Sequence, residues 1–254
     1  MSEPGDKPTT KVPGREPLTA PLPKRFYKQV TVNEQSDGFA VQLDGRPVRT
    51  PKKRQLLVPT RALAEAIAEE WAAQAERIDP ATMPLSKLAI TTIDGVAENM
   101  PDVRGDIVHF AGSDLLCYRA EAPAALADLQ GKAWDPTLRW IEAETGEQFF
   151  LAEGVMPVTQ SAAALAAFAR LVDPFAAFAL ASLHVMTTLT GSAFLALAVA
   201  MRRMPVADAW AAAHLDEDWQ IARWGIDVEA ADRRERRWQE MQAAARFLDL
   251  LKAA

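Results

Sequence analysis

The residues of this sequence that could do chemistry are three histidines, one cysteine and several clustered carboxylates. His214, Glu217 and Asp218 occur at spacings i, i+3 and i+4, so their side chains would share one face of a helix. Such a set could hold a metal ion. A di-iron bundle, however, uses two Glu-x-x-His pairs and two further glutamates, whereas here the order is reversed and occurs once. A metal-assisted enzyme is therefore the alternative hypothesis, and neither a metal site nor a cofactor is predicted.

The remaining candidate groups also fail to form a recognisable catalytic motif. His109 and His184 have apolar neighbours, which predicts core histidines, and Cys117 lies in the apolar run LLCY, which predicts a buried, inert thiol. Ser113 and Ser192 each follow a glycine but lack the second glycine of a nucleophile elbow. The chain also has no phosphate-binding glycine motif. We therefore predict no catalytic residue and no enzymatic activity.

Composition narrows the class of protein further. The chain has 254 residues, of which 49% are hydrophobic, enough for a sizeable core. Its net charge of −6 argues against a general nucleic-acid binder, which needs a basic face. The single cysteine favours a reducing compartment. The first 25 residues lack an apolar signal region and contain Glu3, Asp6 and Glu16. A bacterial cytoplasm is the predicted location, although a processed protein of the mitochondrial matrix would have the same features.

The elements that must position these residues change in character along the chain. Residues 1–24 are rich in proline and predict a disordered tail. Residues 25–125 predict an α+β domain with strands at RFYKQVTV and QLLVP and a hairpin at Asp44-Gly45. A helix should begin after Thr60, its N-cap, followed by helices at LSKLAITTIDGVAENM and VRGDIVHFAGSDLL and a strand at LLCYRA. Residues 126–254 predict an all-α domain.

One segment of the second domain allows two interpretations. Residues 174–201 carry no formal charge and are long enough to span a bilayer. The run is rich in alanine, contains His184 and three threonines, and is broken at Gly191-Ser192. We therefore prefer a buried hairpin of two helices, of roughly 11–16 residues each, to a stable membrane insertion.

The last quarter of the chain combines acidic, aromatic and basic residues. Its first part contains Asp216, Glu217, Asp218, Trp219 and Trp224. The final helix has an apolar stripe of Trp238, Met241, Ala245 and Leu248 and a basic cluster of Arg233, Arg234, Arg236 and Arg237. An amphipathic helix with a solvated charged face would explain most of these residues. A surface of aromatic anchors ringed by charge, suited to recognising another protein, is the second interpretation.

Four motifs in order along the chain carry a resemblance to a known family. They are RFYKQVTV, LAITTIDG, DLLCYRA and LDEDWQIARWGIDVEA, and the likeness covers roughly residues 25–250. The chain resembles the assembly chaperones for the alpha subunit of ATP synthase found in mitochondria and alphaproteobacteria. The resemblance implies an α+β fold in which the N-terminal part precedes an orthogonal helical bundle.

The resemblance also implies a role and a set of partner-binding residues. The implied role is to bind free alpha subunit until a beta subunit replaces the chaperone, with neither nucleotide nor cofactor. The family's functional acidic position falls on Glu240, in RRWQEM. The other residues expected to bind the partner are Asp216, Glu217, Asp218, Trp219 and Trp224. Nothing in the sequence requires more than a monomer.

Overall fold

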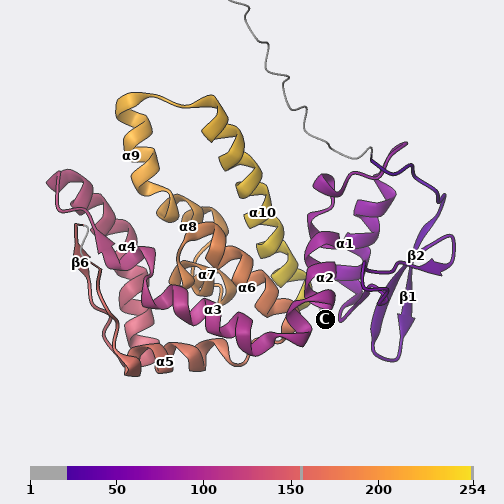
Figure 1. Ribbon diagram of the computed structural model, residues 1–254, viewed down its shortest axis with the longest axis horizontal. Helices are drawn as coiled ribbons and strands as arrows, with labels where there is room; N and C mark the ends of the chain where they lie inside the picture. The colour runs from indigo at the N-terminus through magenta and orange to yellow at the C-terminus, as the bar shows by residue number, and fades with distance from the viewer. Residues whose placement is uncertain (1–21, 155–156, 253–254) are drawn as a thin grey trace, which may run out of the picture.

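A small sheet with covering helices is joined to a larger helical part (Figure 1). The structure is a computed structural model and describes residues 22–154 and 157–252. The predicted α+β class is confirmed. The strands are β1 (Val30–Gln35), β2 (Gly38–Leu43), β3 (Arg46–Pro47), β4 (Leu57–Val58), β5 (Tyr118–Arg119) and β6 (Ala152–Glu153). The α-helices are α1 (Arg61–Ala72), α2 (Pro84–Asp94), α3 (Met100–Gly112), α4 (Ala124–Thr145), α5 (Ala162–Val172), α6 (Ala177–Thr190), α7 (Ala193–Ala200), α8 (Val206–Ala213), α9 (Leu215–Trp224) and α10 (Val228–Lys252).

The antiparallel sheet is organised around β2. β1 pairs with one edge of β2 along its whole length, and β3 and β4 also pair with β2. The predicted turn between β2 and β3 is confirmed, because Asp44 (φ 48°) and Gly45 (φ 77°) both have positive φ. The predicted strand at RFYKQVTV begins later than expected, at Val30. Preceding residues instead contact Asp44, whose Oδ1 accepts a hydrogen bond from the Gln29 amide at 2.8 Å.

The end of the predicted tail is only partly within the structure. Residues 1–21 lie outside the described residues. Residues 22–24, assigned to the tail from sequence, run beside the loop after α1: the Ile78 amide donates to the Pro23 carbonyl at 2.8 Å, and Arg77 Nη1 donates to the Leu22 carbonyl at 2.7 Å. These three residues therefore belong with the N-terminal part.

The helix that covers the sheet, α1, begins where the sequence predicts. Thr60 is the N-cap of α1, and its Oγ1 accepts a hydrogen bond from the Leu63 amide at 3.3 Å. Leu63 and Ile67 are buried beneath the sheet. Glu70 then ties α1 to α2, because its carboxylate accepts the Leu85 and Ser86 amides, each at 2.8 Å, at the start of α2.

The predicted strand at LLCYRA is mostly wrong. Leu115–Cys117 form a 3₁₀ turn, because the Asp114 side chain accepts the Leu116 amide at 3.0 Å and starts a helical turn. Only Tyr118–Arg119 are extended, as β5. They pair in parallel with β6 in a separate two-stranded sheet rather than with the first sheet.

The uncharged segment folds as the predicted helical hairpin. α6 ends at Gly191 (φ 67°), and the Ser192 side chain caps α7 by accepting the Leu195 amide at 3.0 Å. Every residue of α7 is buried, although α7 has 8 residues and is shorter than expected. Among residues 22–154 and 157–252, we find no helix with both the length and the apolar character needed to cross a bilayer.

The long C-terminal helix connects the two parts of the molecule. Its predicted stripe is confirmed, since Met241, Ala245 and Leu248 are buried and Trp238 is half-buried. Its C-terminal half packs on α6, α2 and α1 (Figure 1). Thr60 Oγ1 donates to the Leu250 carbonyl at 2.8 Å, which joins the start of α1 to the end of α10. The domain boundary at residue 125 remains a prediction; α3, which precedes it, packs on α5, α6 and α7.

Candidate functional site

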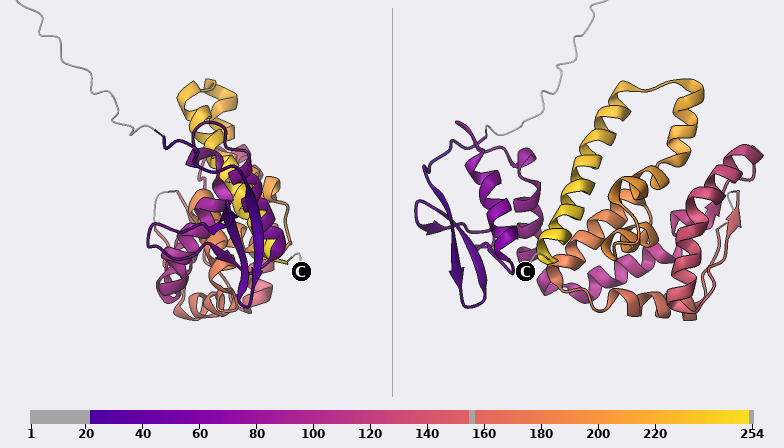
Figure 2. Two further views of the ribbon diagram at one scale, coloured as in Figure 1. Left: turned by 90° about the vertical axis from the view of Figure 1, so that its right-hand side faces the viewer. Right: turned by 180° about the vertical axis from the view of Figure 1, so that it is seen from behind.

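Three exposed apolar side chains lie together at the tip of the hairpin formed by α9 and α10. This hairpin projects from the body of the molecule (Figure 1; Figure 2, both views). Gly225 (φ 87°) ends α9, and Asp227 starts α10, because its Oδ1 accepts the Glu229 amide at 2.8 Å. Between and beside these residues, Trp224, Ile226 and Val228 are 77%, 64% and 72% exposed. We call these three residues the apolar tip.

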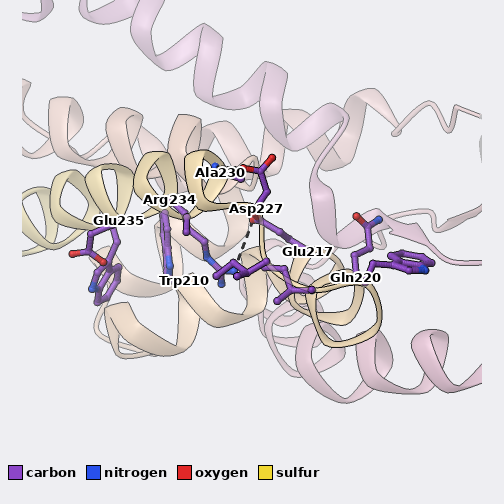
Figure 3. Close-up of a pocket in the computed structure, with 13 residues that line it drawn as sticks. Trp210, Glu217, Gln220, Asp227, Ala230, Arg234 and Glu235 are labelled. Atoms are coloured by element: carbon purple, nitrogen blue, oxygen red, sulfur yellow. Dashed lines mark hydrogen bonds and ion pairs between the residues drawn. The ribbon is translucent and has the colours of Figure 1, made fainter.

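A cleft of about 390 Å³ lies behind the apolar tip, between α9 and α10 (Figure 3). Its apolar lining includes Trp210, Ile221, Trp224, Ile226 and Trp238. The rings of Trp210 and Trp238 lie 5.4 Å apart at its base. None of the residues of α9 is buried, so this helix offers its side chains to the cleft and to solvent.

The three predicted acidic residues of α9 have protein partners. Asp216 Oδ1 accepts a hydrogen bond from Gln130 Nε2 of α4 at 2.8 Å. Arg234 of α10 reaches across the cleft toward Glu217 (Figure 3), with its Nη1 4.0 Å from Glu217 Oε2 and 2.5 Å from Asp218 Oδ1. The hydrogen bond to Asp218 raises the pKa of the Arg234 guanidinium. These carboxylates therefore hold α9 to its neighbours.

The two predicted tryptophans of α9 differ in their surroundings. Trp219 is half-buried and lies under the Arg223 guanidinium, which is 3.4 Å from the centre of its ring. Trp224 belongs to the apolar tip and extends into solvent. Sequence reasoning did not select Ile226 and Val228, although alternation of apolar residues with Gly225 and Asp227 between two helices was a signal that could have found them.

Glu240 lies in a different place, on α10 beside the N-terminal part. Its side chain is 51% exposed, and its Oε1 is 3.7 Å from Lys87 Nζ of α2. It lines a groove of about 520 Å³ between α2 and α10. The apolar lining of this groove includes Pro84, Leu88, Val185, Ala243 and Ala244. Glu240 follows Val228 by twelve positions, about 18 Å along α10. The six predicted partner-binding residues therefore form two regions rather than one.

The candidate metal set at His214 is not assembled. His214 is buried, its Nδ1 lies 2.9 Å from the Trp210 carbonyl, and its ring packs on that of Trp210 at 3.8 Å. Burial lowers the pKa of its imidazole. Glu217 and Asp218 are paired with Arg234 instead. Throughout the part of the chain that the structure describes, no group of three or more histidine, cysteine or acidic side chains is placed to hold a metal ion.

The other histidines differ from the sequence prediction. His109 is exposed, so its prediction as a core residue is wrong: its apolar sequence neighbours point to other faces of α3. His184 is half-buried, with its Nε2 3.8 Å from Asp106 Oδ2. Burial lowers the pKa of His184, and the Asp106 charge opposes that effect.

A buried carboxylate that sequence reasoning missed lies in the loop after α3, against the start of α7. Asp114 is fully buried and accepts hydrogen bonds from Ser192 Oγ at 2.7 Å and the Phe194 amide at 3.1 Å. Burial raises its pKa to about 7. Cys117 is also buried, as predicted, and burial raises the pKa of its thiol to about 12, which makes the thiol unreactive.

The fold and the exposed hairpin define a protein with a surface suited to binding another protein. A sequence model of the ATP12 chaperone protein family matches residues 24–142. The crystal structure of Atp12 from Paracoccus denitrificans has a TM-score of 0.86 and 40% sequence identity, covering 90% of this chain and 98% of that one. The protein Atu1473 of Agrobacterium tumefaciens has a TM-score of 0.87 and 47% identity, covering 93% and 92%. The chain belongs to the ATP12 chaperone family.

A curated relative extends the comparison to a eukaryote. Over 151 residues the chain is 26% identical to the protein atp12, mitochondrial, of Schizosaccharomyces pombe. The match covers 54% of this chain and 50% of the yeast protein, so it spans about half the length of that relative.

Proposed function

We propose that this protein is an assembly chaperone that binds the unassembled alpha subunit of ATP synthase and prevents its aggregation until it pairs with the beta subunit. The observation that carries the proposal is the similarity to Atp12 from Paracoccus denitrificans, which extends over 98% of that chain at 40% identity. An unassembled subunit exposes an apolar interface that promotes aggregation. Covering that interface requires binding and release, without a cofactor.

Two regions of the molecule are the proposed contacts. Glu240 offers a carboxylate at the rim of the apolar groove between α2 and α10. Trp224 offers an exposed aromatic anchor on the hairpin. Asp216, Glu217 and Asp218 act mainly by holding α9 in position, since each contacts a side chain of another helix. Trp219 contacts Arg223 within α9 itself and remains a proposed contact.

The alternative, a metal-assisted enzyme, is not favoured. Its candidate ligand His214 is engaged by Trp210, and its candidate carboxylates by Arg234. We propose that the chaperone acts in a bacterial cytoplasm, or in the mitochondrial matrix if the source is a eukaryote.

Co-expression tests this function. The host's alpha subunit is produced with and without this protein, and its distribution between supernatant and pellet is measured, followed by affinity capture. We expect alpha to stay soluble and to co-purify only when the chaperone is present. Equal aggregation in both cultures, with no capture, would contradict the proposed function.

A further inference from the structure

We propose that the apolar tip and the cleft behind it dock an apolar segment of the unassembled alpha subunit that carries at least one lysine or arginine. The inference rests on the proposed function. It adds a second contact, distinct from the groove at Glu240, and it specifies the chemistry of the segment that fits there.

The exposure of the apolar tip is the first argument. Single exposed apolar side chains are common on protein surfaces. Here Trp224, Ile226 and Val228 fall within five consecutive positions, and each is at least 64% exposed at the end of a projecting hairpin. Apolar side chains gathered in this way mark an interaction site.

The cleft continues the apolar surface inward. Trp210 and Trp238 line its base and Trp224 its rim, so a partner side chain that enters would meet aromatic rings. Tryptophan is enriched at the energetic centres of protein interfaces. The volume of about 390 Å³ lies within the range of clefts that enclose a ligand group.

The charge around the cleft determines what kind of segment fits. The charged residues that line the cleft are three carboxylates, of Glu217, Asp227 and Glu235, and one arginine, Arg234, a net charge of −2. Arg234 already pairs with Asp218 and Glu217, and the nearby Arg233 is 3.8 Å from Glu229. Carboxylates such as Asp232 and Glu235 remain exposed. A basic residue beside the apolar segment would therefore be attracted.

The same charge argues against a second copy of this chain as the occupant. A symmetric contact between two tips would bring the same surface of each copy together. Two cleft linings, each with a net charge of −2, would then repel each other. A chemically different partner with basic residues avoids this repulsion.

The test compares the full chain with three variants by their affinity for alpha subunit in an immobilised-chaperone binding assay. The tip variant is Trp224→Ser/Ile226→Ser/Val228→Ser. The matched control is Phe26→Ser/Phe150→Ser/Leu151→Ser, which removes exposed apolar side chains elsewhere. The charge variant is Asp232→Asn/Glu235→Gln. Thermal unfolding confirms that each variant is folded, and sedimentation reports self-association.

We expect the tip variant to bind alpha at least about thirtyfold more weakly, the loss typical of one hot-spot residue, and the control to bind normally. The charge variant should bind more weakly at low salt and show a weaker salt dependence. Equal binding by a folded tip variant would overturn the inference while leaving the proposed function intact. Normal binding by the charge variant would overturn the inference that the docked segment carries a lysine or arginine. If the wild type forms dimers and the tip variant does not, the apolar tip would be a surface for self-association and the inference would be overturned. A wild type that binds no alpha would overturn the proposed function as well.

Discussion

At the scale of single residues, a substitution of Glu240 tests whether the groove between α2 and α10 binds the alpha subunit. We expect Glu240→Lys to lose alpha-subunit binding while the protein stays folded, because reversing an exposed charge costs little stability. The matched control is Glu69→Lys, since Glu69 is also exposed and lies 3.7 Å from a basic partner, Arg246. Binding is measured by affinity capture and folding by urea denaturation.

A charge swap separates contact with the partner from a structural role. Glu240→Lys/Lys87→Glu restores an ion pair between α2 and α10. If Glu240 contacts the alpha subunit, the swapped protein should still fail to bind it. Recovery of binding in the double variant would show instead that Glu240 acts by pairing with Lys87.

The buried carboxyl of Asp114 should make the stability of the fold depend on pH. Its folded pKa of about 7 lies above its ordinary value of 3.8, so the folded state favours the neutral acid. Ionisation of this carboxyl therefore lowers the free energy of unfolding progressively as pH rises from about 4 to about 7. Above pH 7 the free energy of unfolding falls no further from this cause. We expect the unfolding free energy of the wild type, relative to Asp114→Asn, to fall on the order of 2 kcal/mol between pH 5 and pH 8. Urea denaturation at both pH values measures it, and a difference that is constant with pH would contradict the prediction.

At the scale of elements, the connection between α6 and α7 depends on backbone conformation. Gly191 has φ 67°, and a Cβ placed there would meet nothing within 4 Å, so only backbone strain would oppose a side chain. We expect Gly191→Ala to destabilise the protein by about 1–2 kcal/mol. The control is Gly105→Ala in α3, where a Cβ also meets nothing and alanine should stabilise the helix by up to about 1 kcal/mol. Thermal unfolding of both variants tests this, and equal effects would refute it.

Elements with a local pattern could be predicted from the sequence. The N-cap at Thr60, the turn at Asp44-Gly45 and the break at Gly191 each follow from the chemistry of one or two residues. The predicted strand at LLCYRA does contain β5, but its pairing with β6 could not be predicted, because β6 is distant in sequence. His109 was misplaced because its apolar sequence neighbours lie on different faces of a helix.

The candidate site was predictable in residue type but not in arrangement. The sequence indicated the acidic and aromatic residues of α9, but their partners Gln130 and Arg234 come from other helices. Glu240 faces Lys87 because α10 crosses to α2, a tertiary contact that no local pattern encodes. Exposure of Trp224 likewise depends on the projection of the hairpin.

At the scale of the whole molecule, α10 spans both proposed contacts. It carries the groove at Glu240, beside the N-terminal part, and begins at the apolar tip (Figure 1). The tie between Thr60 and Leu250 fixes its C-terminal end to α1. A subunit held at both regions would lie along this helix, which suits a chaperone that covers a broad interface.

The most direct test of the central claim is the mass of the purified complex, measured by size-exclusion chromatography with light scattering. With alpha subunit alone, we predict a complex of one alpha and one chaperone of 27.8 kDa. Addition of beta subunit should return the chaperone as a free monomer and place alpha with beta. A chaperone that elutes alone while alpha aggregates, or that stays bound after beta is added, would contradict the account.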